Sequence, residues 1–134
     1  MMLAKRRILI GEDDPSILRM TKARLEHEGY DVVTAEDGEA VLQQSGGEPR
    51  IPLILLEVKM PNLSGYAVCE ELRHRSATAA IPVIIFTASE THWQRLADRC
   101  IEIGATDWIK KPFRTKDLMV KIHHALGDEE ERNG

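Results

Sequence analysis

The chain has 134 residues, a length that suits one domain with an ordinary hydrophobic core. Apolar residues make up 43% of the sequence and charged residues 30%, the balance of a soluble globular protein. A net charge of −4 argues against a broad nucleic-acid-binding face. No apolar run is long enough to cross a bilayer, and the N-terminal segment is too short for a secretory signal. We therefore expect a cytoplasmic protein without a membrane partner, in which Cys69 and Cys100 are reduced packing residues.

Short apolar runs alternate with amphipathic segments along the chain, which indicates an α/β fold with five strands and five helices. The predicted strands cover residues 7–10, 30–34, 53–56, 81–86 and 107–110. Such alternation predicts a parallel sheet with helices on both faces, because parallel neighbours need crossover connections. Periodicity alone does not give the order of the strands.

Each predicted helix follows a residue that can cap it. These capping residues are Asp14 (before Pro15), Asp37, Ser64, Thr91 (with Gln94 at capping-box spacing) and Thr115. We expect a single domain over residues 4–127, followed by an acidic tail, residues 128–134, that frays.

Charged and hydroxyl side chains follow four of the predicted strands. Glu12 and Asp13 come after the first strand, Glu57 after the third, Thr87 at the end of the fourth and Lys111 after the fifth. The carboxyl ends of parallel strands meet at one edge of a sheet, and sites lie there, near the point where the strand order reverses. Clustered carboxylates repel one another, so a hard divalent cation such as Mg²⁺ is a natural neutraliser.

Taken together, Glu12-Asp13-Asp14, the acid Glu57 after a buried strand, Thr87-Ala88 and Lys111-Pro112-Phe113 occur in an order that resembles the receiver domain of two-component response regulators. The resemblance covers nearly the whole chain. It implies a flavodoxin-like, doubly wound α/β fold with strand order 2-1-3-4-5 and five helices. It also implies a binding module in a phosphorelay, controlled by a sensor histidine kinase, rather than an enzyme.

The resemblance implies a magnesium site as well. Glu12 and Asp13 match the family's two magnesium-binding acids, and Glu57 stands at the position of the acid that accepts the phosphoryl group. The matching backbone carbonyl would be that of Lys59. Magnesium takes oxygen ligands and keeps several waters, so this donor set would suffice.

The remaining matches concern the phosphoryl group and the switch. The resemblance implies that the Thr87 hydroxyl bonds a phosphoryl oxygen, that Ala88 leaves room for phosphate, and that Lys111 pairs with the acceptor carboxylate or the phosphoryl group. It also implies a cis peptide bond before Pro112. Trp108 stands where the family has a switch aromatic residue; the alternative is a tryptophan that only packs.

Glu57 is the departure from the family pattern, which has aspartate at this position. The extra methylene moves the carboxylate outward by about 1.5 Å. Phosphoryl transfer depends on in-line positioning, so we expect little transfer to Glu57. A carboxylate brings one negative charge against nearly two for a phosphoryl group, which predicts partial mimicry of the phosphorylated state.

Two other functions are alternatives. A small magnesium-dependent phosphatase or phosphotransferase with an acidic nucleophile would resemble haloacid-dehalogenase enzymes, but residues 12–15 do not supply their Asp-x-Asp-x-Thr-like start. A flavin-binding flavodoxin-like protein would need a phosphate cradle, whereas the acidic loop after the first strand would repel phosphate.

The expected partners of a receiver domain are the histidine kinase and a downstream output protein or domain. A second copy of the chain could also dock on the fourth helix, fifth strand and fifth helix. This surface would lie around Trp93, Trp108 and Lys116.

Overall fold

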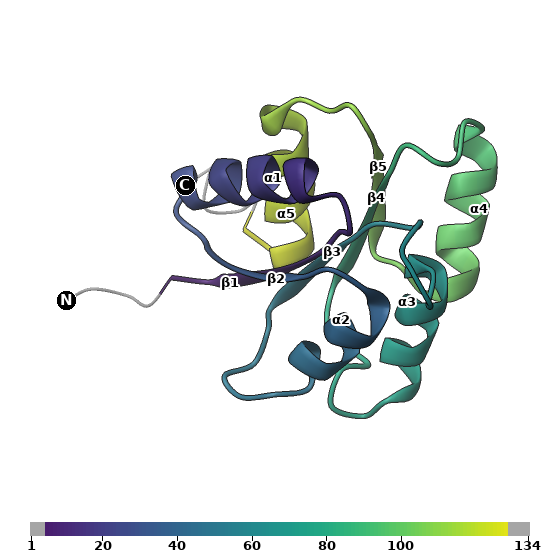
Figure 1. Ribbon diagram of the computed structural model, residues 1–134, viewed down its shortest axis with the longest axis horizontal. Helices are drawn as coiled ribbons and strands as arrows, with labels where there is room; N and C mark the ends of the chain where they lie inside the picture. Colours follow the sequence, from purple (N-terminus) through teal and green to yellow (C-terminus); the bar gives the residue numbers. More distant parts are fainter. Residues whose placement is uncertain (1–4, 129–134) are drawn as a thin grey trace.

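The computed structural model describes residues 5–128, and these form five strands that alternate with five helices (Figure 1). The elements are β1 (Arg7–Gly11), α1 (Pro15–His27), β2 (Asp31–Ala35), α2 (Gly38–Ser45), β3 (Leu53–Leu56), α3 (Gly65–His74), β4 (Val83–Thr87), α4 (Trp93–Ile103), β5 (Asp107–Lys110) and α5 (Thr115–Leu126).

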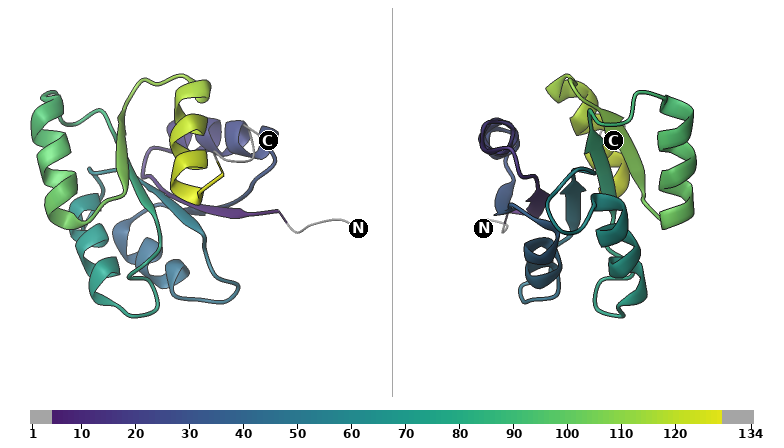
Figure 2. Two further views of the ribbon diagram at one scale, coloured as in Figure 1. Left: turned by 180° about the vertical axis from the view of Figure 1, so that it is seen from behind. Right: turned by 45° about the vertical axis from the view of Figure 1, so that its right-hand side comes forward.

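The strands form one parallel sheet in the order β2-β1-β3-β4-β5, which confirms the predicted flavodoxin-like topology. Helices α1 and α5 cover one face, and α2, α3 and α4 cover the other (Figure 2). The order reverses between β1 and β3, so the crevice beyond their carboxyl ends is the place where such a sheet holds its site.

Alternate residues of the central strands pack into two separate hydrophobic cores, one on each face of the sheet. In β3, Ile54 and Leu56 pack with the core under α2, α3 and α4, whereas Leu53 and Leu55 pack with the core under α1 and α5. All residues of β3 and β4 are buried. This two-sided burial explains their continuous apolar sequence and fixes the register, because a shift of one residue would exchange the two faces.

Three predicted helix caps are confirmed. The Asp14 carboxylate accepts hydrogen bonds from the backbone N–H groups of Ser16 and Ile17, with Pro15 in the first helical turn. Asp37 and Ser64 likewise accept backbone N–H bonds at the starts of α2 and α3. Each cap satisfies donors that have no partner within the helix.

The other two predicted caps were wrong. Helix α4 begins after His92, one residue later than a Thr91 cap requires, and it has no side-chain cap. The Thr91 carbonyl accepts a bond from Lys110 Nζ, and the His92 N–H donates to Glu90. Helix α5 starts one residue earlier than a Thr115 cap requires: Thr115 is already helical and follows Arg114.

Asp128, the first residue of the predicted tail, is bonded at the end of α5. Its backbone N–H donates to His123 O over 2.8 Å, and its carboxylate accepts two bonds from Arg6. Residues 129–134, the rest of that predicted tail, and residue 4 lie outside the described residues. Across residues 5–128, no helix is long and apolar enough to span a membrane.

Candidate functional site

Four side chains from the ends of different strands converge at the carboxyl edge of the sheet. Glu12 and Glu57 follow β1 and β3 on either side of the switch point, Thr87 ends β4, and Lys111 follows β5. The backbone holds these ends together, since the Glu57 N–H donates to Gly11 O over 2.9 Å. The edge thus brings together residues that are distant in the sequence.

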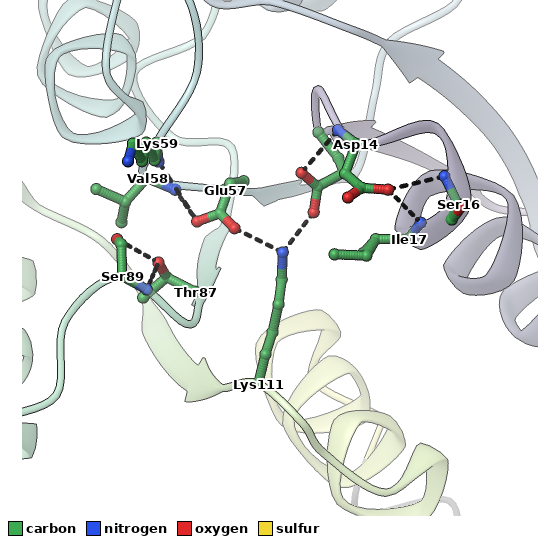
Figure 3. Close-up of polar contacts among 10 residues, drawn as sticks. Asp14, Ser16, Ile17, Glu57, Val58, Lys59, Thr87, Ser89 and Lys111 are labelled. Carbon is green, nitrogen blue, oxygen red and sulfur yellow. Dashed lines mark hydrogen bonds and ion pairs between the residues drawn. The ribbon is translucent and has the colours of Figure 1, made fainter.

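Lys111 lies between the two buried acids, and Figure 3 shows its contact with Glu57. Its Nζ donates to Glu57 Oε1 over 2.6 Å and also to Glu12 Oε1. Glu12 is 1% exposed and Glu57 is 7% exposed. The ammonium group also lies 4.4 Å from the ring centroid of Phe86. The peptide bond between Lys111 and Pro112 is cis, as the resemblance implied.

The second carboxylate oxygen of Glu57 accepts hydrogen bonds from the backbone of the β3–α3 loop. Glu57 Oε2 accepts the Val58 N–H over 2.6 Å and, more weakly, the Lys59 N–H over 3.4 Å. The carboxylate therefore holds a lysine ammonium group on one oxygen and backbone donors on the other. Both oxygens of the Glu57 carboxylate are thus occupied by hydrogen-bond donors.

Gly65 makes this loop possible. A Cβ at position 65 would lie 2.0 Å from Glu57 O, a distance that the backbone could relieve only by moving. The Gly65 N–H also donates to Val58 O over 2.7 Å. The first residue of α3 is thus packed directly against the backbone that positions Glu57.

Glu12 is more deeply buried than Glu57. Its Oε2 accepts the Asp14 N–H over 3.2 Å. Burial raises the pKa of the Glu12 carboxyl above its ordinary value, while the bond and charge of Lys111 oppose the shift. The adjacent Asp13 is exposed, so the two neighbouring acids have different environments.

Thr87 is fully buried, and its hydroxyl is bonded to Ser89 (Figure 3). Thr87 Oγ1 accepts the Ser89 N–H over 3.0 Å and lies 2.8 Å from Ser89 Oγ. Sequence reasoning missed Ser89. The available signal was a hydroxyl residue two positions after a threonine at a strand end, the spacing of a local hydroxyl turn.

The acids line an open pocket of about 390 Å³, together with Lys59 and with Ala88 of the β4–α4 loop. Oxygen ligands of this kind suit Mg²⁺. Within residues 5–128, however, no three acidic, histidine or cysteine side chains are grouped closely enough to hold a metal ion. The donors are therefore chemically suitable, but Lys111 already occupies one oxygen each of Glu12 and Glu57.

The two tryptophans lie away from the acids. Trp108 in β5 is partly buried and packs against the core beneath α2, α3 and α4. Lys121 Nζ lies 5.6 Å from its ring centroid and 3.0 Å from Asp107 Oδ1. Trp93, at the start of α4, is 59% exposed, and Lys116 in α5 is also exposed.

A parallel five-stranded sheet with acids and a lysine at its switch point defines a flavodoxin-like α/β protein with a polar site. Within that class, the chain belongs to the response regulator receiver domain family, whose model matches residues 8–123. It is 41% identical to the probable transcriptional regulator ycf27 of Cyanophora paradoxa over 94% of this chain and 50% of that protein. It is 33% identical to the alkaline phosphatase synthesis transcriptional regulatory protein PhoP of Bacillus subtilis over 90% of this chain and 48% of that protein. The chain thus spans about half the length of these curated relatives.

Solved structures show the same fold. The chemotaxis protein CheY4 of Vibrio cholerae matches with a TM-score of 0.83 and 29% identity, over 92% of this chain and 100% of that chain. The receiver domain of a sensor histidine kinase from Pseudomonas aeruginosa matches with a TM-score of 0.83 and 28% identity, over 92% of this chain and 99% of that chain. That structure has a magnesium ion coordinated in its active site cleft.

Proposed function

We propose that this chain is a non-enzymatic receiver module in which Glu57 stands at the phosphoacceptor position and mimics part of the phosphorylated state. The observation that carries the proposal is the set of contacts made by its carboxylate. One oxygen holds Lys111 at 2.6 Å, and the other accepts backbone N–H groups of the β3–α3 loop. These groups are charged or polarised donors of the kind that stabilise an anion.

The mimicry is partial because Thr87 takes no part in it. The Thr87 hydroxyl bonds to Ser89, and Glu57 makes its contacts with Lys111 and the loop instead. A phosphoryl group has three acceptor oxygens and nearly two negative charges, against two oxygens and one charge for a carboxylate. Glu57 therefore makes the contacts with Lys111 and the loop that a phosphoryl group would make, but not a contact with the Thr87 hydroxyl.

We also propose that Mg²⁺ binds here, with Glu12, Asp13, Glu57 and the Lys59 carbonyl as ligands. The acids supply hard oxygen donors in one pocket, and a related receiver domain has magnesium in its cleft. A bound magnesium ion would supply positive charge between the carboxylates and any phosphoryl oxygens. Lys111 already neutralises part of the charge of Glu12 and Glu57, so we expect millimolar-class affinity.

The proposed partners follow from family membership. They are a sensor histidine kinase and an output domain or protein, encountered in the cytoplasm. Two curated relatives are named as transcriptional regulators and are about twice as long as this chain. An output function of that kind would lie in sequence beyond the region that this chain matches.

A phosphodonor assay tests the role of Glu57. The full chain and Glu57→Asp are incubated with acetyl phosphate and Mg²⁺, and intact mass is measured. In Glu57→Asp, a carboxylate oxygen would bond to phosphorus as acetate leaves, adding one phosphoryl group. We expect labelling of Glu57→Asp, with the native chain and the control Glu57→Gln essentially unlabelled.

Equal labelling of the native chain and Glu57→Asp would refute the geometric argument. Repeated release of inorganic phosphate by the native chain, abolished in Glu57→Gln, would instead support the phosphatase alternative.

A further inference from the structure

At the end of β4, the hydroxyl groups of Thr87 and Ser89 are in contact. Ser89 lines the same pocket as Glu12, Asp13 and Glu57, which we call the acidic site. Thr87 is 0% exposed, whereas Ser89 lies at the surface. Ser89 makes two contacts with the threonine: its N–H donates to Thr87 Oγ1 over 3.0 Å, and its Oγ lies 2.8 Å from the same atom. The buried hydroxyl is thus bonded to a residue of its own loop.

A threonine hydroxyl has one donor and two acceptor positions. If Thr87 donates to Ser89 Oγ, its only proton is unavailable to an anion at residue 57. If Ser89 Oγ donates instead, both acceptor positions of Thr87 are filled from the Ser89 side, and the direction of the hydroxyl is fixed by these bonds. In the first arrangement an anion at residue 57 competes with Ser89 for the Thr87 proton. In the second arrangement that proton stays free, and Ser89 fixes only the direction in which it points.

We propose that the first arrangement holds, with Ser89 as a positioning residue that accepts the Thr87 hydroxyl proton. This inference deepens the proposed function, because it names the contact that an anion at residue 57 must displace to engage Thr87. The exposed Ser89 hydroxyl can exchange its bond for one to water, so the hold is reversible. A net neutral hydrogen bond of this kind corresponds to about a two- to tenfold effect on an equilibrium.

Ser89→Ala isolates the hydroxyl, since the backbone N–H bond to Thr87 Oγ1 remains. The conservative control is Ser89→Thr, which keeps a hydroxyl at the same position. Both changes are at an exposed loop residue, so we expect unaltered melting temperatures.

The first measurement uses the native chain. Three-bond scalar couplings of ¹³C-labelled Thr87 report its χ1 rotamer populations by NMR. We expect one dominant rotamer in the native chain and in Ser89→Thr, and a mixture in Ser89→Ala. An unchanged rotamer distribution in Ser89→Ala would overturn the proposal, because the backbone bond alone would then hold Thr87.

The second measurement uses Glu57→Asp with beryllium fluoride, an analogue of a phosphoryl group on aspartate, in the presence of Mg²⁺. We expect Ser89→Ala to tighten its binding about two- to tenfold in ¹⁹F NMR titrations, and Ser89→Thr to restore the starting affinity. In Glu57→Asp/Thr87→Ala, removal of the Ser89 hydroxyl should have no further effect. An equal gain with and without the Thr87 hydroxyl would refute an action through Thr87.

The two measurements separate the two hypotheses. Failure of Glu57→Asp to bind beryllium fluoride in any Ser89 variant would refute the proposed acceptor position. The rotamer measurement on the native chain would still decide whether Ser89 holds Thr87.

Discussion

Lys111 is the residue on which the charge balance of the acidic site depends. It is the ion-pair partner of both Glu12 and Glu57, which are nearly inaccessible to water. Lys111→Met would leave two buried carboxylates facing each other, and uncompensated buried charge costs about 3–5 kcal/mol. We expect a loss of that order in the free energy of unfolding in urea at pH 7, partly restored by Mg²⁺.

The neighbouring Lys110 is the matched control, because among residues 5–128 its Nζ donates to the Thr91 carbonyl and makes no ion pair. Lys110→Met should cost about 1 kcal/mol or less. The penalty in Lys111→Met should also shrink as the pH falls toward the raised pKa of Glu12, since a protonated carboxyl no longer needs a cation. Equal losses in the two lysine variants, or a loss independent of pH, would contradict this role.

Cys69 and Cys100 should be unreactive in the folded protein. Burial raises the pKa of the Cys69 thiol to about 11 and that of the Cys100 thiol to about 12. At pH 8 only about one thiol in a thousand would be a thiolate at position 69, and fewer at position 100. We expect negligible modification by a disulfide reagent at pH 8 and two modified thiols per chain in urea. Rapid labelling without denaturant would show that the α3–α4 packing opens readily.

The positions of the site residues and the pairing of Lys111 with Glu57 could be predicted, but the other bonds of the site could not. Glu12, Glu57, Thr87 and Lys111 could be predicted to meet because each follows or ends a strand of one parallel sheet. The shared contact of Lys111 with both acids, and the pairing of Thr87 with Ser89, depend on side-chain rotamers. Those rotamers are set by burial and by neighbours from other elements, which sequence spacing does not contain.

At the scale of single elements, some helices begin at a residue whose own side chain caps them, whereas others begin at a residue that nearby sequence does not predict. Asp14 and Ser64 cap helices through bonds within three residues, so local sequence predicted them. Thr91 is not the cap, because α4 begins one residue later than predicted, and the Thr91 carbonyl instead bonds a lysine from the end of β5. Strand ends show the same limit: β4 begins at Val83, two residues after the predicted start, and extends to Thr87.

The caps can be compared by substitution. Ser64→Ala should lower the free energy of unfolding by about 1 kcal/mol, because the Ala67 N–H loses its partner. Thr91→Ala should change it by less than about 0.5 kcal/mol, because the Thr91 side chain does not cap α4. Urea unfolding of the two variants beside the native chain measures both. A larger loss for Thr91→Ala would mean that this hydroxyl stabilises the helix in solution.

For the whole molecule, the edge of the sheet at β5, flanked by α4 and α5, offers the surface proposed for a second copy. Trp93 is 59% exposed and Ile101 is 78% exposed, and the two residues lie two turns apart on one face of α4. Large apolar side chains that are exposed close together mark docking surfaces more often than single exposed apolar side chains do. Trp108 is partly buried and packs inward, so it contributes less to the surface than predicted.

Trp93→Ala should leave the free energy of unfolding within about 1 kcal/mol of the native value and should weaken self-association. Sedimentation velocity over a range of concentrations, paired with urea unfolding, measures both effects. Met20→Ala is a suitable control, because Met20 is an exposed apolar residue on α1, across the sheet from α4. Unchanged association in Trp93→Ala, or equal weakening in Met20→Ala, would count against this surface.

The ion pair between Arg6 and Asp128 brings the two ends of the described residues together. Both carboxylate oxygens of Asp128 lie within 2.9 Å of Arg6 Nη1, so the start of β1 and the end of α5 are neighbours. The loop at Gly46 and Gly47 is exposed, and nothing packs closely against it. A chain joined from Asp128 to Arg6 by a short linker and opened between these glycines would begin near β3 and could keep every contact of the acidic site. We therefore expect the arrangement of Glu12, Glu57, Thr87 and Lys111 in space to be independent of their order along the chain.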